Sequence, residues 1–351
     1  MAASPTTGRR TLSSALFALI VVTAIWGSTF SLSKDLLTRM AVTDYLALRF
    51  LTAALVIGAA RPRVLLRLDR RIVAIGATLG LLYFTGQLLQ FIGLQHTAAT
   101  VSAFVVSMYV VFTPLITAVL LRRRPDRITL VATGLAIAGV AAMSLRGYAL
   151  GPGELLTLVA ALVYAMHILA LGRWTTGRTA YALTFVQLLT MGICFLVVSS
   201  VDGVQGPERG DWFAFLYLAV VAGAVAMLVQ TWAQAHVPSS QAAVLMVLEP
   251  VWAAVFGFVL WQEQADLRTL IGAALVLAAM LLIVAGPRGT LATAGAADAA
   301  GVGAPLSAVV GGDVADLSDD ADSTSIQSFE HSPADKRSLN AGDAPADARH
   351  R

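Results

Sequence analysis

The feature that most constrains this chain is a set of ten apolar stretches, each long enough to cross a lipid bilayer. About 20 apolar helical residues span the roughly 30 Å hydrocarbon core of a membrane. Only 13% of the 351 residues are charged, whereas soluble domains carry about 25%. The predicted spans cover residues 13–33, 44–60, 72–94, 99–121, 128–145, 153–171, 180–201, 212–233, 239–260 and 267–286. The sequence therefore predicts an all-α membrane protein with ten transmembrane helices and no separate globular domain.

The ten predicted spans fall into two related halves of five. Shifting the sequence against itself by 136–140 residues aligns residues of similar type across successive spans. The aligned pairs are Trp26/Tyr164, Thr29/His167, Arg49/Gln187 and Gly134/Gly272 at 138, Gln90/Gln230 and His96/His236 at 140, and Pro114/Pro250 at 136. An odd number of crossings in each half makes the second half enter the membrane from the opposite side. We therefore predict two inverted five-helix repeats around a site near the middle of the bilayer.

The repeats divide the chain into four segments. We expect a cytoplasmic N-terminal segment at 1–12, a first repeat at 13–147 and a second repeat at 148–286. Residues 287–351 are rich in Ala, Gly, Asp and Ser and show no apolar periodicity. Such a segment cannot bury enough apolar surface to offset the chain entropy lost on folding. This composition predicts a disordered cytoplasmic tail.

The distribution of positive charge predicts how the chain lies in the membrane. With a cytoplasmic N-terminus, 14 Lys and Arg residues fall in inner segments and 5 in outer loops. Positive residues favour the cytoplasmic side, so we expect a multi-pass protein of the plasma (inner) membrane with both termini in the cytoplasm. The basic loops lie at helix ends and lack interleaved aromatic residues. We therefore expect the lipid bilayer, and not nucleic acid, as their partner.

Several short motifs recur in an order that resembles a known family. The motifs are Trp26-Gly27-Ser28-Thr29-Phe30 in the first span, Leu48-Arg49-Phe50 in the second, Tyr109-Val110-Val111-Phe112-Thr113-Pro114-Leu115 in the fourth, and Leu248-Glu249-Pro250-Val251 in the ninth. Together with ten spans, this set resembles the drug/metabolite transporter superfamily, specifically permeases with two EamA repeats. Many relatives have a Glu just after the fourth span, where this chain has three arginines from Arg122 to Arg124. The corresponding Glu of the second half, just after the ninth span, is present as Glu263.

The resemblance implies a ten-helix secondary transporter that does not hydrolyse ATP. Members of the family move small metabolites, amino acids or toxic compounds, mostly outward, and are thought to use alternating access. The implied partner is a small-molecule substrate of a class that membership leaves open. No enzyme activity and no cofactor are expected, and the oligomeric state stays open. The single cysteine, Cys194, also excludes a Cys/His metal cluster and an intrachain disulfide.

Glu249 lies near the middle of the ninth predicted span. An acidic side chain at the centre of a transmembrane helix costs about 2.5–3.5 kcal/mol on insertion scales, so it normally faces protein or water. Its neighbour Pro250 leaves the carbonyl of Met246 without a helical donor. Glu249 is therefore a candidate for proton coupling or substrate binding. The alternative is a protonated carboxyl that hydrogen-bonds a neighbouring helix at a proline kink.

Other polar groups within the spans predict a binding cavity. Tyr83, Gln87 and Gln90 share one face of the third span, at spacings i, i+4 and i+7, and should avoid lipid. They could line a hydrophilic path or bridge helices. In the first and sixth spans an aromatic residue precedes a polar one by three positions. These pairs, Trp26/Thr29 and Tyr164/His167, are candidates for binding an organic substrate.

Two candidates have competing interpretations. His167 could transfer protons near neutral pH, or it could be a neutral, hydrogen-bonded packing residue. Arg49, in the second span, could extend to the membrane surface, pair with Asp35 or Asp44, or attract an anionic substrate.

Two other classes of function remain open beside a transporter. A non-transporting membrane scaffold or regulator would not need polar stripes within the bilayer. A lipid-modifying membrane enzyme would usually show clustered Asp, His or Glu in its loops, whereas the loops here are short and rich in Arg. A nucleotide-binding site of the P-loop or dinucleotide type is not expected, because the sequence has no glycine-rich turn that links a strand to a helix.

Overall fold

The computed structural model describes residues 5–66, 68–120, 122, 124–146, 149–176, 179–201, 203–234, 245–264 and 266–285. The predicted tail at 287–351 lies outside these residues. The first half comprises helices α1 (Pro5–Leu36), α2 (Val42–Ala60), α3 (Pro62–Leu65), α4 (Arg70–Gln95), α5 (Ala99–Val106), α6 (Tyr109–Leu120) and α7 (Arg127–Ser144). The second half comprises α8 (Pro152–Trp174), α9 (Ala180–Ser199), α10 (Trp212–Leu216), the π-helix η1 (Tyr217–Val225), α11 (Ala226–Gln234), α13 (Leu248–Leu260) and α14 (Leu267–Ala285). The short strands β1 (Leu145–Arg146) and β2 (Ala149–Leu150) pair antiparallel between the halves.

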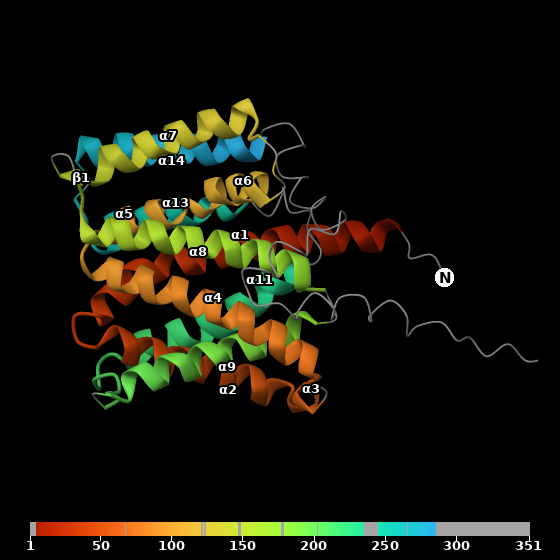
Figure 1. Ribbon diagram of the computed structural model, residues 1–351. Coiled ribbons are helices and arrows are strands. Elements are labelled where there is room, and N and C mark those ends of the chain that lie inside the picture. The colour runs from red at the N-terminus through yellow and green to blue at the C-terminus, as the bar shows by residue number, and fades with distance from the viewer. Residues whose placement is uncertain are drawn as a thin grey trace, which may run out of the picture.

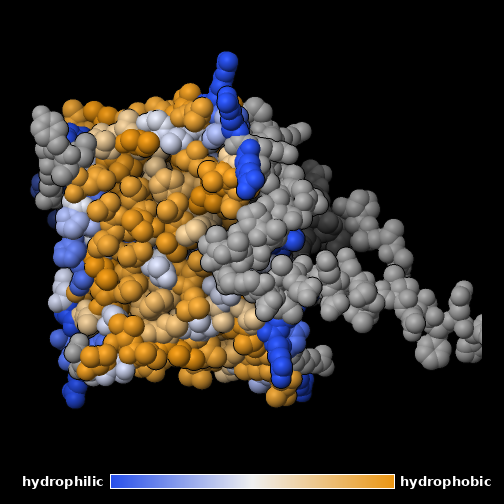
Figure 2. All heavy atoms as spheres, in the orientation of Figure 1, coloured by the Kyte–Doolittle hydropathy of each residue, from blue (hydrophilic) through white to orange (hydrophobic). Residues whose placement is uncertain are grey.

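The prediction of an all-α membrane protein is confirmed. Nine helical segments of the described residues are long and apolar enough to cross a membrane. The ninth predicted span, 239–260, is described from residue 245 onward and contains the shorter apolar helix α13. Figure 2 shows a broad hydrophobic belt between two edges where hydrophilic residues gather. Apolar side chains on this belt suit contact with lipid, because water is absent from the bilayer core.

The helices of the two halves pack as an inverted repeat. Figure 1 shows α1 running from the N-terminus toward the end that holds β1, and α8 starting there and running back. Contacts recur when the halves are exchanged: α4 packs on α8 as α1 packs on α11, and α5 packs on α8 as α1 packs on α13. Two equivalent helix pairs, α2 with α9 and α7 with α14, meet each other directly. This arrangement is the pseudo-two-fold symmetry that the sequence offsets predict.

Local irregularities also repeat between the halves. The fourth predicted span is broken at Ser107, where i→i−3 hydrogen bonds replace the helical pattern between α5 and α6. The second half has a turn at Val247, 140 residues later, just before α13. Arg122 and Gln262, also 140 residues apart, both have a φ of 51°. The sequence pattern did not indicate these four positions, because proline and glycine are the usual signals of a broken helix or a turn and none of the four residues is proline or glycine.

The eighth predicted span contains a second irregularity that sequence periodicity missed. Nine residues, Tyr217–Val225, form the π-helix η1 between α10 and α11. π-helical turns are rare and are frequently found at functional sites. Side chains of the first half bind carbonyls of this segment: Trp26 Nε1 donates to the Ala222 oxygen at 3.0 Å, and Arg49 Nε donates to the Leu218 oxygen at 3.1 Å. The π-helix therefore packs against α1 and α2, whose side chains bind its carbonyls.

Polar side chains tie the two repeats together at one end of the bundle. We call this end, which holds residues 37–41, 96–98, 203–211 and 261–264, the tied end. Glu263 of the second half accepts hydrogen bonds from Ala99 N at 2.9 Å and from Thr100 N and Oγ1 at 3.1 and 2.6 Å. A carboxylate at the N-terminus of α5 is favourable, because the first backbone N–H groups of a helix lack partners.

The tied end also has an ion pair and further hydrogen bonds between the two halves. Arg39 of the first half bridges Asp35 at 2.7 Å and Asp211 of the second half at 2.8 Å. Hydrogen bonding to the Arg39 guanidinium lowers the pKa of the Asp211 carboxyl. The hydroxyl of Thr97 donates to Glu154 at 2.9 Å, which again joins the halves. These contacts join the two halves at the tied end.

Candidate functional site

A cavity lined by both apolar and polar side chains lies between the repeats. Its volume is about 90 Å³, several times the roughly 10–15 Å³ that one water molecule needs. The cavity is lined by Trp26, Thr29 and Phe30 of α1, Arg49 of α2, Tyr83, Gln87, Gln90 and Phe91 of α4, Val106 of α5, Tyr109 of α6, Tyr164, His167, Ile168 and Leu171 of α8, Gln187 of α9, Met227, Gln230 and Thr231 of α11, Met246, and Glu249 of α13. Every residue that the sequence predicted for the site is in this set.

The lining is itself duplicated. All lining residues except Tyr83 and Leu171 form pairs at an offset of 138 or 140 residues. The pairs are Trp26/Tyr164, Thr29/His167, Phe30/Ile168, Arg49/Gln187, Gln87/Met227, Gln90/Gln230, Phe91/Thr231, Val106/Met246 and Tyr109/Glu249. The cavity therefore lies on the pseudo-two-fold axis, where an inverted-repeat transporter holds its substrate.

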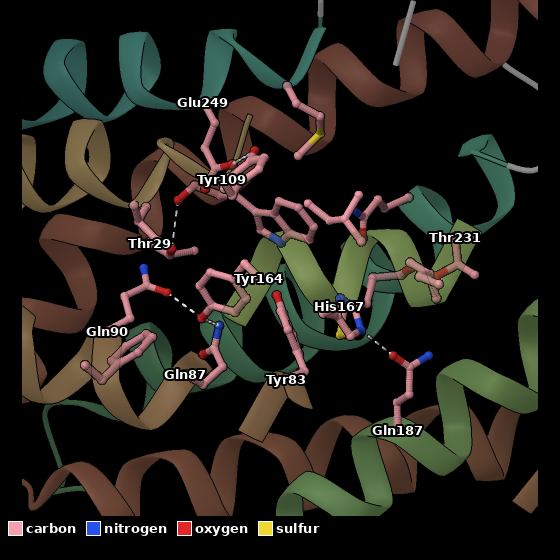
Figure 3. A pocket seen from close by; sticks show the side chains of 18 of the residues that line it. Thr29, Tyr83, Gln87, Gln90, Tyr109, Tyr164, His167, Gln187, Thr231 and Glu249 are labelled. Atoms are coloured by element: carbon pink, nitrogen blue, oxygen red, sulfur yellow. Dashed lines mark hydrogen bonds between the residues drawn. The ribbon is translucent and has the colours of Figure 1, made fainter. Parts of the chain in front are cut away.

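A chain of hydrogen bonds crosses the cavity from α4 to α8. Gln87 Nε2 donates to the Tyr164 hydroxyl at 2.8 Å, and that hydroxyl donates to Gln90 Oε1 at 2.6 Å, as Figure 3 shows. The Gln87 Oε1 atom is buried and accepts no hydrogen bond in the described part of the chain. A buried unpaired acceptor is costly. A solute that donates an N–H or O–H group would satisfy it.

His167 and Tyr83 form the neighbouring wall. His167 Nε2 and Gln187 Oε1 are 2.9 Å apart, and both side chains are buried. The ring of Tyr83 stacks on His167 with centroids 4.8 Å apart and is tilted against Tyr164 at 5.2 Å. The amide partner and the stacked ring hold the imidazole in one orientation.

Glu249 faces the cavity from α13, at the edge opposite Gln187 in Figure 3. The hydroxyl of Tyr109, its counterpart in the first repeat, donates to Glu249 Oε2 at 3.4 Å. Pro250, which follows it, contributes no backbone N–H, and the chain turns at Val247. Glu249 therefore combines both predicted features, a place on the cavity wall and a hydrogen bond to a neighbouring helix.

Trp26 and Thr29 complete the wall on α1. The Trp26 indole is fixed by its bond to the π-helix, and Thr29 Oγ1 donates to the Trp26 carbonyl one turn earlier at 2.7 Å. The indole face, the threonine methyl group and the acceptor lone pairs of Thr29 Oγ1 are therefore left to contact a solute. Among the described residues, no group of three or more His, Cys, Asp or Glu side chains converges to hold a metal ion.

Arg49 is buried in the cavity wall, with 5% of its surface exposed. The predicted alternatives of extension to the surface and pairing with Asp35 or Asp44 are wrong. Asp35 binds Arg39, and Asp44 accepts hydrogen bonds from Ser199 Oγ and from the backbone of Gln205. With both carboxylates engaged by other partners, Arg49 turns inward and binds the Leu218 carbonyl of η1.

Sequence reasoning missed about half of the lining, including Tyr109, Gln187 and Thr231. The repeat would have identified Tyr109 and Gln187, because they are offset by 140 and 138 residues from Glu249 and Arg49. It would not have identified Thr231, whose counterpart Phe91 was missed as well. The apolar members, such as Val106 and Met246, gave no signal, since apolar residues are everywhere in a membrane helix.

Comparison with known proteins gives matches of three kinds. Residues 13–145 and 151–285 each match the EamA-like transporter family. A protein of Archaeoglobus fulgidus described as an uncharacterized transporter is 28% identical over 271 residues, which cover 76% of this chain and 84% of that protein. A crystal structure is similar with a TM-score of 0.58 and 17% identity, covering 77% of this chain and 96% of the other. This last likeness shows a shared fold.

Proposed function

Because the chain belongs to the EamA-like transporter family, we propose that it is a secondary active transporter that exports a small organic metabolite, amino acid or drug-like compound by alternating access. The duplicated cavity is the observation that supports this proposal most strongly. A site on a pseudo-two-fold axis keeps the same lining when the two repeats exchange conformations. Rocking one repeat against the other then exposes that lining first on one side of the membrane and next on the other.

The tied end suggests how one side is closed. Its hydrogen bonds join residues of the two repeats, so any opening there must separate Glu263 from α5 and Arg39 from Asp211. In the proposed orientation, with both termini in the cytoplasm of a cell bounded by a plasma (inner) membrane, this end faces outward. A fluorescent protein that folds only in the cytoplasm, fused to the C-terminus, tests this orientation; the absence of fluorescence in an expressed fusion would contradict it.

The cavity side chains have distinct proposed roles. Trp26, Thr29, Tyr83 and Tyr164 contact the body of the solute, and the amides of Gln87 and Gln90 bind its polar groups. Glu249 couples transport to protons, with His167 as the second candidate. A carboxyl group inside the membrane can alternate between bonding a proton and bonding a solute, and intramembrane acidic residues commonly serve proton relays.

Transport in reconstituted vesicles tests the proposal. We expect purified protein in proteoliposomes to move at least one compound from a panel of amino acids, organic acids, nucleosides and cationic dyes faster than protein-free vesicles. An imposed proton gradient should drive that compound against its concentration gradient. If the folded protein moved no compound of a broad panel, the scaffold alternative would be favoured.

A further inference from the structure

We propose that Arg49 is the binding group for a carboxylate on the transported solute. This inference rests on the proposed function of the cavity as the solute site and specifies its chemistry. Arg49 lies on α2 and lines the cavity. It is seven residues from Val42, where the helix begins, and this distance is a rise of about 10 Å along the helix axis. Its charge therefore lies within the apolar belt and not at its edge.

The guanidinium has unused donors. Arg49 Nε binds the Leu218 carbonyl and Nη1 binds the Tyr45 hydroxyl, both at 3.1 Å. A guanidinium has five N–H groups in a planar fork that fits the two oxygens of a carboxylate. The hydrogen bonds found among the described residues engage Nε and one of the two N–H groups of Nη1. Nη2 and the second N–H of Nη1 are left for the oxygens of a carboxylate.

The charge also lacks an ionic partner. Neither of the ion pairs found among the described residues involves Arg49. Three aromatic rings, those of Tyr45, Phe50 and Phe91, lie 5.5–5.8 Å from the Arg49 guanidinium carbon. Aromatic faces stabilise a cation only partly, about 0.5–2 kcal/mol each. A buried charge without a counter-ion is costly, and an anionic solute would remove that cost.

A purely structural role does not require the charge. Gln187 occupies the equivalent position of the second repeat and is fully buried. Its neutral amide is satisfied there by hydrogen bonds to His167 and to the Leu183 carbonyl. A neutral amide could likewise donate to the Leu218 carbonyl. At this position of the cavity wall the two repeats thus differ in charge, and the charged member is a group able to bind an anion.

The rest of the lining favours a carboxylate over a phosphate. Apart from His167, Arg49 is the one basic residue of the lining, so a phosphate dianion would not be neutralised. The aromatic walls suit a small apolar or aromatic body, and the Gln87 Oε1 acceptor suits one donor group. The inferred solute is a small monocarboxylate with an apolar body.

Binding of matched acids and amides tests this inference. The purified full chain in detergent would be titrated by calorimetry with benzoate and benzamide, phenylacetate and phenylacetamide, and hydrocinnamate and its amide. Hydrogen bonds to charged groups contribute about 1.5–3 kcal/mol, so wild type should bind the carboxylate of at least one pair about 10- to 100-fold more tightly. Arg49→Gln should abolish this preference, and Arg49→Lys should reduce it, because an ammonium lacks the planar fork.

Arg63→Gln is the matched control, because Arg63 is exposed on α3 and lies outside the cavity; it should keep the wild-type preference. If Arg49→Gln does not fold, the comparison of wild type with Arg49→Lys decides. Equal binding of acid and amide by wild type, an unchanged preference in Arg49→Lys and Arg49→Gln, or no binding of any acid would overturn the inference.

Transport measured on the same proteins separates this inference from the proposed function. Arg49-dependent binding of an acid, without movement of that acid in proteoliposomes, would leave the carboxylate site standing and contradict transport. Movement of neutral solutes, without any Arg49-dependent preference for acids, would contradict the carboxylate site and leave transport standing.

Discussion

Glu249→Gln is expected to abolish proton-driven transport while solute exchange without a gradient continues. Glutamine keeps the size of the side chain and can still accept the hydrogen bond from the Tyr109 hydroxyl, but it cannot release a proton. Proton-driven accumulation in proteoliposomes should therefore fall to the level of protein-free vesicles. Counterflow of labelled against unlabelled solute measures the exchange that should remain.

Two further variants make this result specific. Glu249→Asp keeps an ionisable group and should retain part of the driven transport. Glu208→Gln changes an exposed glutamate in a loop of the tied end and should behave as wild type. Driven transport at the wild-type level in Glu249→Gln would place coupling elsewhere, with His167 as the next group to test. Loss of folded protein would assign Glu249 the structural role of a bond between helices.

Gly27→Val is expected to destabilise the bundle strongly and to abolish transport. A Cβ atom at Gly27 would lie 2.5 Å from Trp252 Cβ, 2.8 Å from the backbone nitrogen of Ala253 and 3.0 Å from the backbone carbonyl oxygen of Glu249. Two of these atoms are backbone, so α1 and α13 must move apart. Overpacking in a core costs about 1–3 kcal/mol and occasionally more. The same displacement would move Glu249 relative to the cavity.

Thermal unfolding in detergent, together with the yield of folded protein, measures this effect. Gly134→Val is the matched control, because a Cβ atom at Gly134 meets nothing within 4 Å. Gly134→Val should unfold close to the wild-type temperature. Equal unfolding temperatures for Gly27→Val and Gly134→Val would show that α1 and α13 do not pack as closely as the structure has them.

Much of the fold and part of the site follow from the sequence for simple physical reasons. Hydropathy locates the spans because the bilayer excludes unsatisfied polar backbone. Intramembrane polar residues such as Gln87, Gln90 and Glu249 point to the cavity, since lipid-facing positions would not tolerate them. The offset that aligns Trp26 with Tyr164 also brings these two residues to one cavity, because a pseudo-two-fold axis places equivalent residues around itself.

Other features depend on tertiary packing and could not be predicted. The π-helix η1 does not change hydropathy or period enough to be seen, and its carbonyls acquire partners only when α1 and α2 pack against it. For Arg49 the sequence leaves open extension to the surface, pairing with Asp35 or Asp44, and attraction of an anionic substrate. The structure turns the side chain toward Leu218, 169 residues away. The ties made by Glu263 likewise join residues more than 160 positions apart.

Access to the cavity from both sides of the membrane tests alternating access most directly. Cysteines would replace Gln90 and Gln230, one at a time, in a chain whose native Cys194 is changed to Ala. A membrane-impermeant maleimide would then be applied to either face of proteoliposomes of known orientation, with and without a proton gradient. Alternating access predicts that each cysteine reacts from both faces, and that the gradient raises its reactivity from one face while lowering it from the other. Reaction from a single face under every condition would contradict alternating access through this cavity.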